Sequence, residues 1–193
     1  MFFNFKKATS QAPIFSVSLF LVLVLLHAVP TVFERFHFDR YLVFELHEWW
    51  RLLSSQLVHL DARHLIMNAA TLLLLGYFFE TEYHKKPFVP ILLGAFFVAI
   101  QLPFSELDKF CGISGALNAL ILPVAWVLWK KNGSYLVWLF VALHVFRLFF
   151  ELFLGAPLVA NLEWPSYPPS HLLGGFAGAL WLALNEWKGK ARY

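Results

Sequence analysis

The segment ISGALNALILPVAWVLW, Ile113–Trp129, contains 17 residues and no ionisable side chain. A helix that crosses a bilayer needs about 20 mainly apolar residues, with a range of about 17 to 25. The segment is therefore long enough to span a membrane. It also carries a hydroxyl, that of Ser114, close to its beginning, where a polar side chain in a membrane helix is a candidate for function.

Mainly apolar stretches recur along the rest of the chain, at residues 12–29, 64–79, 88–103, 134–150 and 171–187. The 193 residues are 60% hydrophobic and 14% charged, whereas soluble domains carry about 25% charged residues. No internal repeat or Gly-, Ser- or Pro-rich linker divides them. We therefore predict an all-α polytopic membrane protein with six transmembrane helices in a single domain, residues 1–193.

The basic residues are distributed unevenly over the connections between these stretches. Nine of them fall at the two termini and in the second and fourth connections: Lys6, Lys7, Lys85, Lys86, Lys130, Lys131, Lys188, Lys190 and Arg192. The positive-inside rule places these segments in the cytoplasm. The net charge of +3 thus indicates topology and not nucleic-acid binding. The first connection, residues 30–63, contains Trp49 and Trp50 and is predicted to lie in the outer membrane interface.

Four polar side chains begin the second, fourth and sixth predicted helices, which all start at the outer face. They are His64, Asn68, Ser114 and His171. Such groups are costly at membrane depth, so their convergence at one level indicates a functional site. Ser170 is a suitable N-cap for the sixth helix and would fix where it begins.

This set of residues suits nucleophilic acyl transfer. A serine hydroxyl needs a base, and a neutral histidine can take its proton, so Ser114 and His171 form a candidate pair. The Ser114 backbone N–H, His64 and Asn68 are candidate donors to the oxyanion. Two pairs of small residues, Gly115 with Ala119 and Gly174 with Gly178, would let the fourth and sixth helices approach closely, and Gly112 would leave room beside the serine.

These residues resemble the motifs of rhomboid intramembrane serine proteases. The sequence Gly112-Ile-Ser-Gly115 is similar to the GxSG motif of that family. Several other motifs of the family are also matched, and together they occur along the chain in the order that the family has. The others are His59, His64 and Asn68 for HxxxxHxxxN, His171, Gly174 and Gly178 for HxxGxxxG, Trp50-Arg51 for the WR motif, and Glu80 for a glutamate at the inner end of the second helix.

The resemblance implies a Ser114–His171 dyad without an aspartate and without a cofactor. It also implies oxyanion binding by His64 and Asn68 and a structural role for His59. The sequence around Trp49, His59 and Cys111 looks closest to that of rhombosortases, which are bacterial inner-membrane proteases. Rhombosortases remove a C-terminal tail that consists of a Gly-Gly pair, one hydrophobic span and a basic end. Asn118 departs from the family, in which a tyrosine or, in rhombosortases, a histidine often follows the serine by four residues.

Other readings of the same residues are weaker. Imidazoles at similar depth could bind a metal, but no HExxH spacing is present, so we expect no metal site. Cys111, the only cysteine, is expected to be a packing residue, and Arg147 and Glu151 an i, i+4 ion pair on the same side as His144. A general rhomboid protease, an inactive rhomboid-like protein that binds membrane clients, and a small transporter remain as alternatives.

Overall fold

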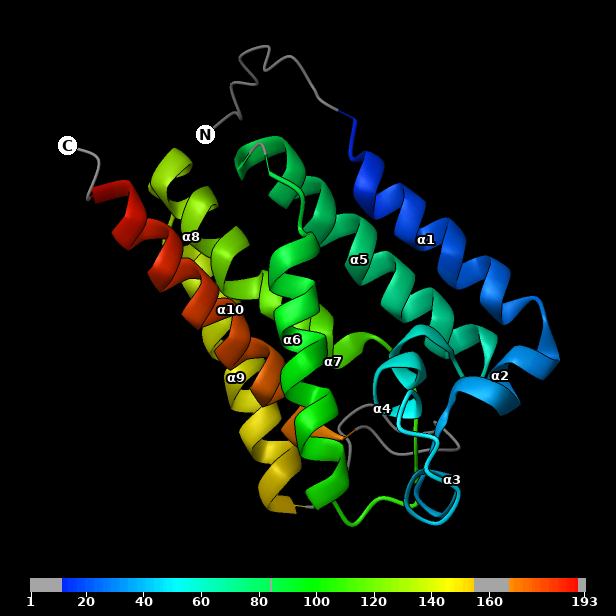
Figure 1. Cartoon of the computed structure of the whole chain (residues 1–193). Helices are drawn as coiled ribbons and strands as arrows, with labels where there is room; N and C mark the ends of the chain where they lie inside the picture. The colour runs from blue at the N-terminus through cyan, green and yellow to red at the C-terminus, as the bar shows by residue number, and fades with distance from the viewer. Residues whose placement is uncertain (1–11, 84, 155–166, 191–193) are drawn as a thin grey trace.

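The protein folds into a bundle of helices, shown by a computed structural model that describes residues 12–83, 85–154 and 167–190. The long helices are α1 (Ile14–His27), α5 (Ala62–Tyr83), α6 (Phe88–Gln101), α8 (Ile121–Asn132), α9 (Leu136–Leu154) and α10 (Pro168–Lys190). In Figure 1, α1 and α5 lie side by side at one edge and α9 and α10 at the other, with α6 between them.

Each of the six apolar stretches overlaps one of these helices, but the count of six spans is not confirmed. Among the described residues, α5 and α9 are long and apolar enough to cross a membrane. A third span would be α1 together with α2 (Pro30–Phe36), although the two helices meet at an angle of 100°. The helix α6 is apolar but short. At about 1.5 Å per residue, a helix of 14 residues covers less than the hydrocarbon thickness of about 30 Å.

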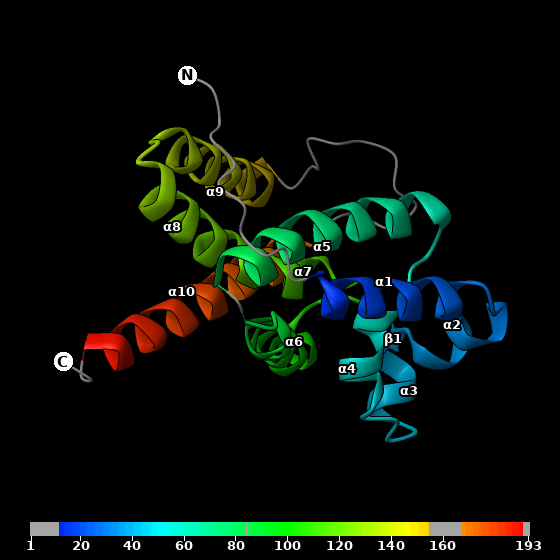
Figure 2. The ribbon, with the colours of Figure 1, turned by 90° about the horizontal axis from the view of Figure 1, so that it is seen from above.

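The apolar segment Ile113–Trp129 does not form one regular helix. It forms α7 (Ser114–Leu117), a 3-10 turn (Asn118–Leu120) and then α8. Seen from above in Figure 2, α7 lies in the middle of the molecule, between α5, α6 and α10. Its Ala116 and Leu117 are fully buried and pack in one apolar cluster with Leu23, Leu72 and Phe79. The start of α7, which carries Ser114, is therefore held by helices on several sides.

The connection between α1 and α5 is a folded unit of short elements. It contains α2, α3 (Arg40–Phe44) and α4 (Arg51–Ser54), and its strand β1 (Phe38–Asp39) pairs antiparallel with β2 (Lys109–Phe110). Arg51 is buried; its Nε contacts Glu48 Oε2 at 2.5 Å, and its Nη1 donates to the carbonyls of Glu34 and His37. Trp50, next to it, is exposed. The two motif residues therefore differ in role, one joining backbone segments and the other facing outward.

Glu80 lies near the end of α5 and is buried against the beginning of α1. Its carboxylate accepts hydrogen bonds from the backbone N–H of Phe15 and Ser16 at 3.1 and 2.9 Å and from the Ser16 hydroxyl at 2.6 Å. The first N–H groups of a helix have no partner within the helix, so the carboxylate caps α1. A Cβ on Gly76 would overlap Ser16 Oγ, which is why α1 can approach α5 here.

Ion pairs hold together the ends of α5, α8 and α10 that are remote from Ser114. Lys131 Nζ lies 2.8 Å from Glu82 Oε1, and Lys130 Nζ lies 2.6 Å from Glu186 Oε2. These pairs put the basic connection after α8 at the same end of the molecule as the connection after α5. Of the nine bases used to predict topology, Lys6, Lys7 and Arg192 lie outside the described residues.

The prediction that Ser170 caps the last helix is wrong. The helix α10 begins at Pro168, and Ser170 lies inside it, 1% exposed, with its hydroxyl donating to the Tyr167 carbonyl at 2.8 Å. Proline is well suited to the first turn of a helix because its ring fixes φ and its missing N–H has no partner there to lose. His171 is consequently one turn further into the helix than expected.

Candidate active site

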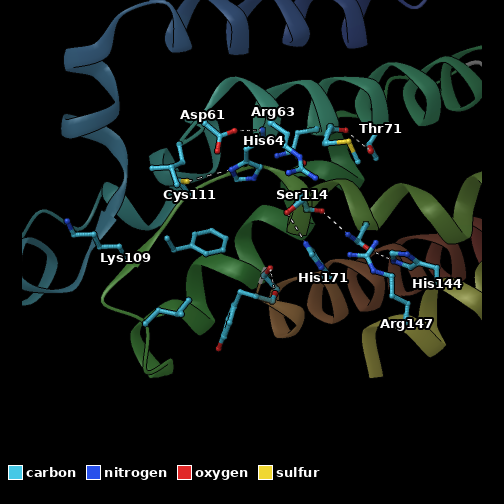
Figure 3. Close-up of a pocket in the computed structure, with 18 of the residues that line it drawn as sticks. Asp61, Arg63, His64, Thr71, Lys109, Cys111, Ser114, His144, Arg147 and His171 are labelled. Carbon is cyan, nitrogen blue, oxygen red and sulfur yellow. Dashed lines mark hydrogen bonds between the residues drawn. The ribbon is translucent and has the colours of Figure 1, made fainter. Parts of the chain in front are cut away.

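A cavity of about 710 Å³ opens beside the start of α7. Its walls come from α5, α7, α9, α10 and the segment 107–111, and they include His64, Asn68, Ser114 and His171. Figure 3 shows Ser114 and His171 directed toward each other in the wall of this cavity, with His64 above the serine. The structure thus brings together the four polar residues that the sequence places at one level.

Ser114 and His171 are in direct contact. Ser114 Oγ lies 2.9 Å from His171 Nε2, within the range of a hydrogen bond between a hydroxyl and an imidazole. If the hydroxyl donates to Nε2, the proton of the neutral imidazole resides on Nδ1. This is the arrangement in which a histidine can take the proton of a serine as the serine attacks a carbonyl carbon.

Gly112, two residues before Ser114, is a position at which only glycine fits. Its φ is +101°, in the region that side chains other than glycine rarely adopt. A Cβ at this position would lie 2.5 Å from both Cε1 and Nε2 of His64. The backbone N–H of Gly112 donates to the Ser55 carbonyl at 3.0 Å. The loop that presents Ser114 is therefore fixed against the 3-10 turn that follows α4, Ser55–Leu57, and leaves room for the His64 ring.

His64 and Asn68 lie on one face of α5 at its start. Asp61 accepts the backbone N–H of His64 at 2.7 Å and so caps this helix, a role that our reading of the sequence missed. Asn68 is 4% exposed, and its Nδ2 has no hydrogen-bond partner among the described residues. A buried amide donor without a partner is costly, so this unpaired donor beside the cavity needs an explanation.

Backbone contacts at glycines set the distance between α10 and the helix of Ser114. A Cβ on Gly174 would overlap the Gly115 carbonyl oxygen, and a Cβ on Gly178 would overlap that of Ala119. On the other side of α7, a Cβ on Gly94 would lie 3.0 Å from the Ala116 carbonyl oxygen. The small residues therefore lie where α6 and α10 approach this chain segment most closely, and the contribution of Gly94 was not predicted.

Asn118, the residue that departs from the family pattern, connects Ser114 to α9. Its Nδ2 donates to the Ser114 carbonyl at 2.8 Å, and its Oδ1 lies 2.6 Å from His144 Nε2. Because an amide oxygen only accepts, the His144 ring must donate through Nε2. Asn118 therefore holds the backbone of Ser114 from within the cavity wall.

Arg147 and Glu151 form the expected ion pair, which is confirmed with Nε and Oε1 3.0 Å apart. The sequence did not show that Arg147 and His144 also line the cavity that contains Ser114. Their spacing of three residues on one helix face was the available signal. Gln101, the one amide in the third apolar stretch, was also missed; its Nε2 donates at 2.6 Å to the hydroxyl of Tyr167, another cavity residue.

Cys111 and His59 both lie next to His64. Burial raises the pKa of the Cys111 thiol to about 12, so the thiol stays protonated and is no nucleophile at neutral pH. Burial, together with the nearby His64 and His27, lowers the pKa of His59 to about 3, so its ring is neutral. His59 packs edge-on against His64 with ring centroids 5.0 Å apart, and its carbonyl faces His27 Nδ1 at 3.3 Å.

No group of three or more His, Cys, Asp or Glu side chains in the described ranges is arranged to hold a metal ion. Two imidazoles, those of His59 and His64, do lie close together. Zinc sites in proteins have three or four protein ligands, which is more than this pair of rings supplies.

The family model for the Rhomboid domain matches residues 46–186, well over half of the chain. The chain belongs to the rhomboid family. Rhomboids are integral membrane proteins and intramembrane serine proteases, and they act on membrane proteins within the lipid bilayer. The matched region of this rhomboid includes Ser114, His171 and the other residues of the cavity wall named above. The comparison with curated proteins found no match.

Proposed function

We propose that the protein is an active intramembrane serine protease in which Ser114 is the nucleophile and His171 the general base and acid. The observation that carries this proposal is the 2.9 Å contact between Ser114 Oγ and His171 Nε2 in the wall of a 710 Å³ cavity. Membership of a protease family and the position of Ser114 within the matched region also support it.

The reaction would proceed through an acyl-enzyme. His171 Nε2 takes the hydroxyl proton as Ser114 Oγ bonds to the scissile carbonyl carbon, which becomes tetrahedral and carries an oxyanion. On collapse, the C–N bond breaks and the imidazolium gives its proton to the leaving amine. Water, deprotonated by His171, then attacks the carbonyl carbon of the ester. When this second tetrahedral intermediate collapses, the bond to Ser114 Oγ breaks and the imidazolium returns the proton to Ser114 Oγ.

The oxyanion would be bound by three donors around the serine: the Ser114 backbone N–H, His64 and Asn68. Support comes from Asn68, a buried amide whose Nδ2 has no partner in the described part of the chain and which lines the cavity. Donors that are already in place stabilise the charge without reorganising, and removing one such donor typically costs about 10² to 10³ in kcat. Gly112 supports His64 in this role by leaving its ring unobstructed.

The substrates would be single-span membrane proteins with a C-terminal hydrophobic tail. A helical backbone hides its carbonyls in hydrogen bonds, so the cleaved region must unwind, and Gly-rich segments unwind at low cost. Together with the likeness of the Trp49, His59 and Cys111 segments to rhombosortases, this favours a Gly-Gly sorting tail. The lysine distribution favours cytoplasmic termini and a site open to the opposite face, and the likeness to rhombosortases favours a bacterial inner membrane with the site facing the periplasm.

Labelling with a fluorophosphonate probe tests the proposed nucleophile. The probe forms a covalent bond with an activated serine, so we expect it to label the wild-type protein and not Ser114→Ala. Gel fluorescence measures the label, and heating the protein before labelling controls for unspecific reaction. A folded wild-type protein that takes up no probe would contradict the proposal and favour the inactive, client-binding alternative.

Co-expression with a model substrate tests the proposed substrate class. We expect a reporter with a Gly-Gly pair, one hydrophobic span and a basic end to lose its tail in the presence of the wild-type protein. Replacing both glycines with leucine should slow cleavage about 15-fold, because leucine favours the helix by about 0.8 kcal/mol per residue relative to glycine, or about 1.6 kcal/mol for the pair. Immunoblotting measures the tail. An uncut Gly-Gly reporter beside a cut general rhomboid substrate would indicate the other branch of the family.

A further inference from the structure

A second cavity, of about 630 Å³, lies at the ends of α5 and α10 that are remote from Ser114. Its walls are apolar: Phe15 from α1, Phe88 and Val89 from the start of α6, and Trp181 from α10. Phe15 and Phe88 meet edge to face with centroids 5.9 Å apart. Phe88 and Val89 are about half exposed, so the apolar wall continues onto the outer surface of the bundle.

The rim of this cavity is basic. Lys85 and Lys86 line it together with Asn185. Lys85 Nζ donates to Asn185 Oδ1 at 2.6 Å and lies 6.0 Å from the centroid of the Trp181 ring, so the ammonium is directed at the cavity. Within the described ranges neither lysine has a carboxylate partner, whereas Lys130 and Lys131 at the same end are paired with Glu186 and Glu82. Two uncompensated positive charges therefore sit above an apolar wall.

We propose that this cavity binds one anionic phospholipid. The phosphate would lie between the ammonium groups of Lys85 and Lys86, and an acyl chain would run along the exposed faces of Phe88 and Val89. The volume is within the range of about 300 to 1,000 Å³ that is common for ligand sites. Basic pockets between membrane helices bind such headgroups, and a lysine near an anionic membrane surface raises the affinity about 5-fold.

The predicted topology agrees with this ligand. It places the connection with Lys85 and Lys86 at the cytoplasmic surface, where anionic lipids are enriched. The bound lipid would contact α1, α6 and α10 at once, because each contributes to the cavity wall. We therefore expect it to stabilise the packing of these three helices against one another.

Lipid retention by the purified protein tests this site. In a non-ionic detergent, we expect native mass spectrometry to show one bound phosphatidylglycerol, retained over phosphatidylcholine with the same acyl chains, and a matching rise in the unfolding temperature. Lys86→Gln should weaken phosphatidylglycerol binding about 5-fold and Lys85→Gln/Lys86→Gln about 30-fold. The single variant matters because Lys85 also contacts Asn185, so the double variant could be less stable for that reason.

The double variant Lys130→Gln/Lys131→Gln is the control for charge, since it removes two positive charges from the same end outside the cavity; because it also breaks two ion pairs, its unfolding temperature is compared with and without lipid. It should keep the preference for phosphatidylglycerol. An equal loss in both double variants, or no preference in the wild type, would overturn the proposal. Inorganic phosphate should have no effect; if it raised the unfolding temperature as much as the lipid, the apolar wall would not be part of the site and the proposal would also fail.

Discussion

His171→Ala will lower the rate of substrate cleavage by about 10² to 10⁴, the usual contribution of a general base. Ser114→Ala will lower it at least as far, and the double variant will be no slower than Ser114→Ala alone. The reason is that the hydroxyl and the imidazole act as one unit through the contact between Oγ and Nε2. Once either is lost, the other has nothing to activate, so the effects are far from additive.

Single-turnover cleavage by purified variants in lipid vesicles would measure these rates. Unfolding temperatures within a few degrees of the wild type would show that the variants remain folded. Independent, additive effects of the two substitutions on the logarithm of the rate would mean that Ser114 and His171 do not act together. A His171→Ala variant with the activity of the wild type would exclude this residue as the base.

Gly174→Ala will lower the cleavage rate by about 10², although the added methyl group never reaches the substrate. The new Cβ would overlap the Gly115 carbonyl oxygen and press on Asn118 Cβ at 3.1 Å, so α10 must move away from α7. His171 is carried by α10 and Ser114 by α7, and a displacement of about 1 Å between reacting groups can cost 10²-fold. Overpacking of this kind also destabilises by about 1 to 3 kcal/mol.

Gly175→Ala is the matched control, because a Cβ on the neighbouring glycine meets no atom within 4 Å. It should leave the cleavage rate unchanged and raise stability by up to about 1 kcal/mol through helix propensity. Cleavage assays and thermal unfolding of the two variants side by side provide the measurement. Equal losses in both variants would show that flexibility of this helix matters and that the close approach at Gly174 does not.

The sequence predicts that His64, Asn68, Ser114 and His171 lie close together, because their positions depend on where the helices begin. Apolar stretches and basic connections locate the helix ends, and with alternating directions the starts of the second, fourth and sixth helices must share one face. The residues at those starts then line one cavity. This inference needs no knowledge of how the helices rotate or bend.

What the sequence could not predict depends on rotation, bending and tertiary contact. The bend of 100° after α1 and the 3-10 turn at Asn118–Leu120 change how far each stretch reaches along the bundle. The cavity position of Arg147 and the contact between Asn118 and His144 depend on how α9 is turned against α8 and α10. Two features could have been found by local rules, namely the start of α10 at Pro168 and the cap of α5 by Asp61.

The glycine contacts around α7 have a consequence for the persistence of the dyad. They join main chain to main chain: α10 meets the carbonyls of Gly115 and Ala119, and α6 meets that of Ala116. Side chains exchange rotamers in picoseconds to nanoseconds, whereas a helix backbone moves only as a body and on slower timescales. The separation of the Ser114 and His171 backbones is therefore buffered against the fast motions of neighbouring side chains, and it will change only when α10 shifts against α7.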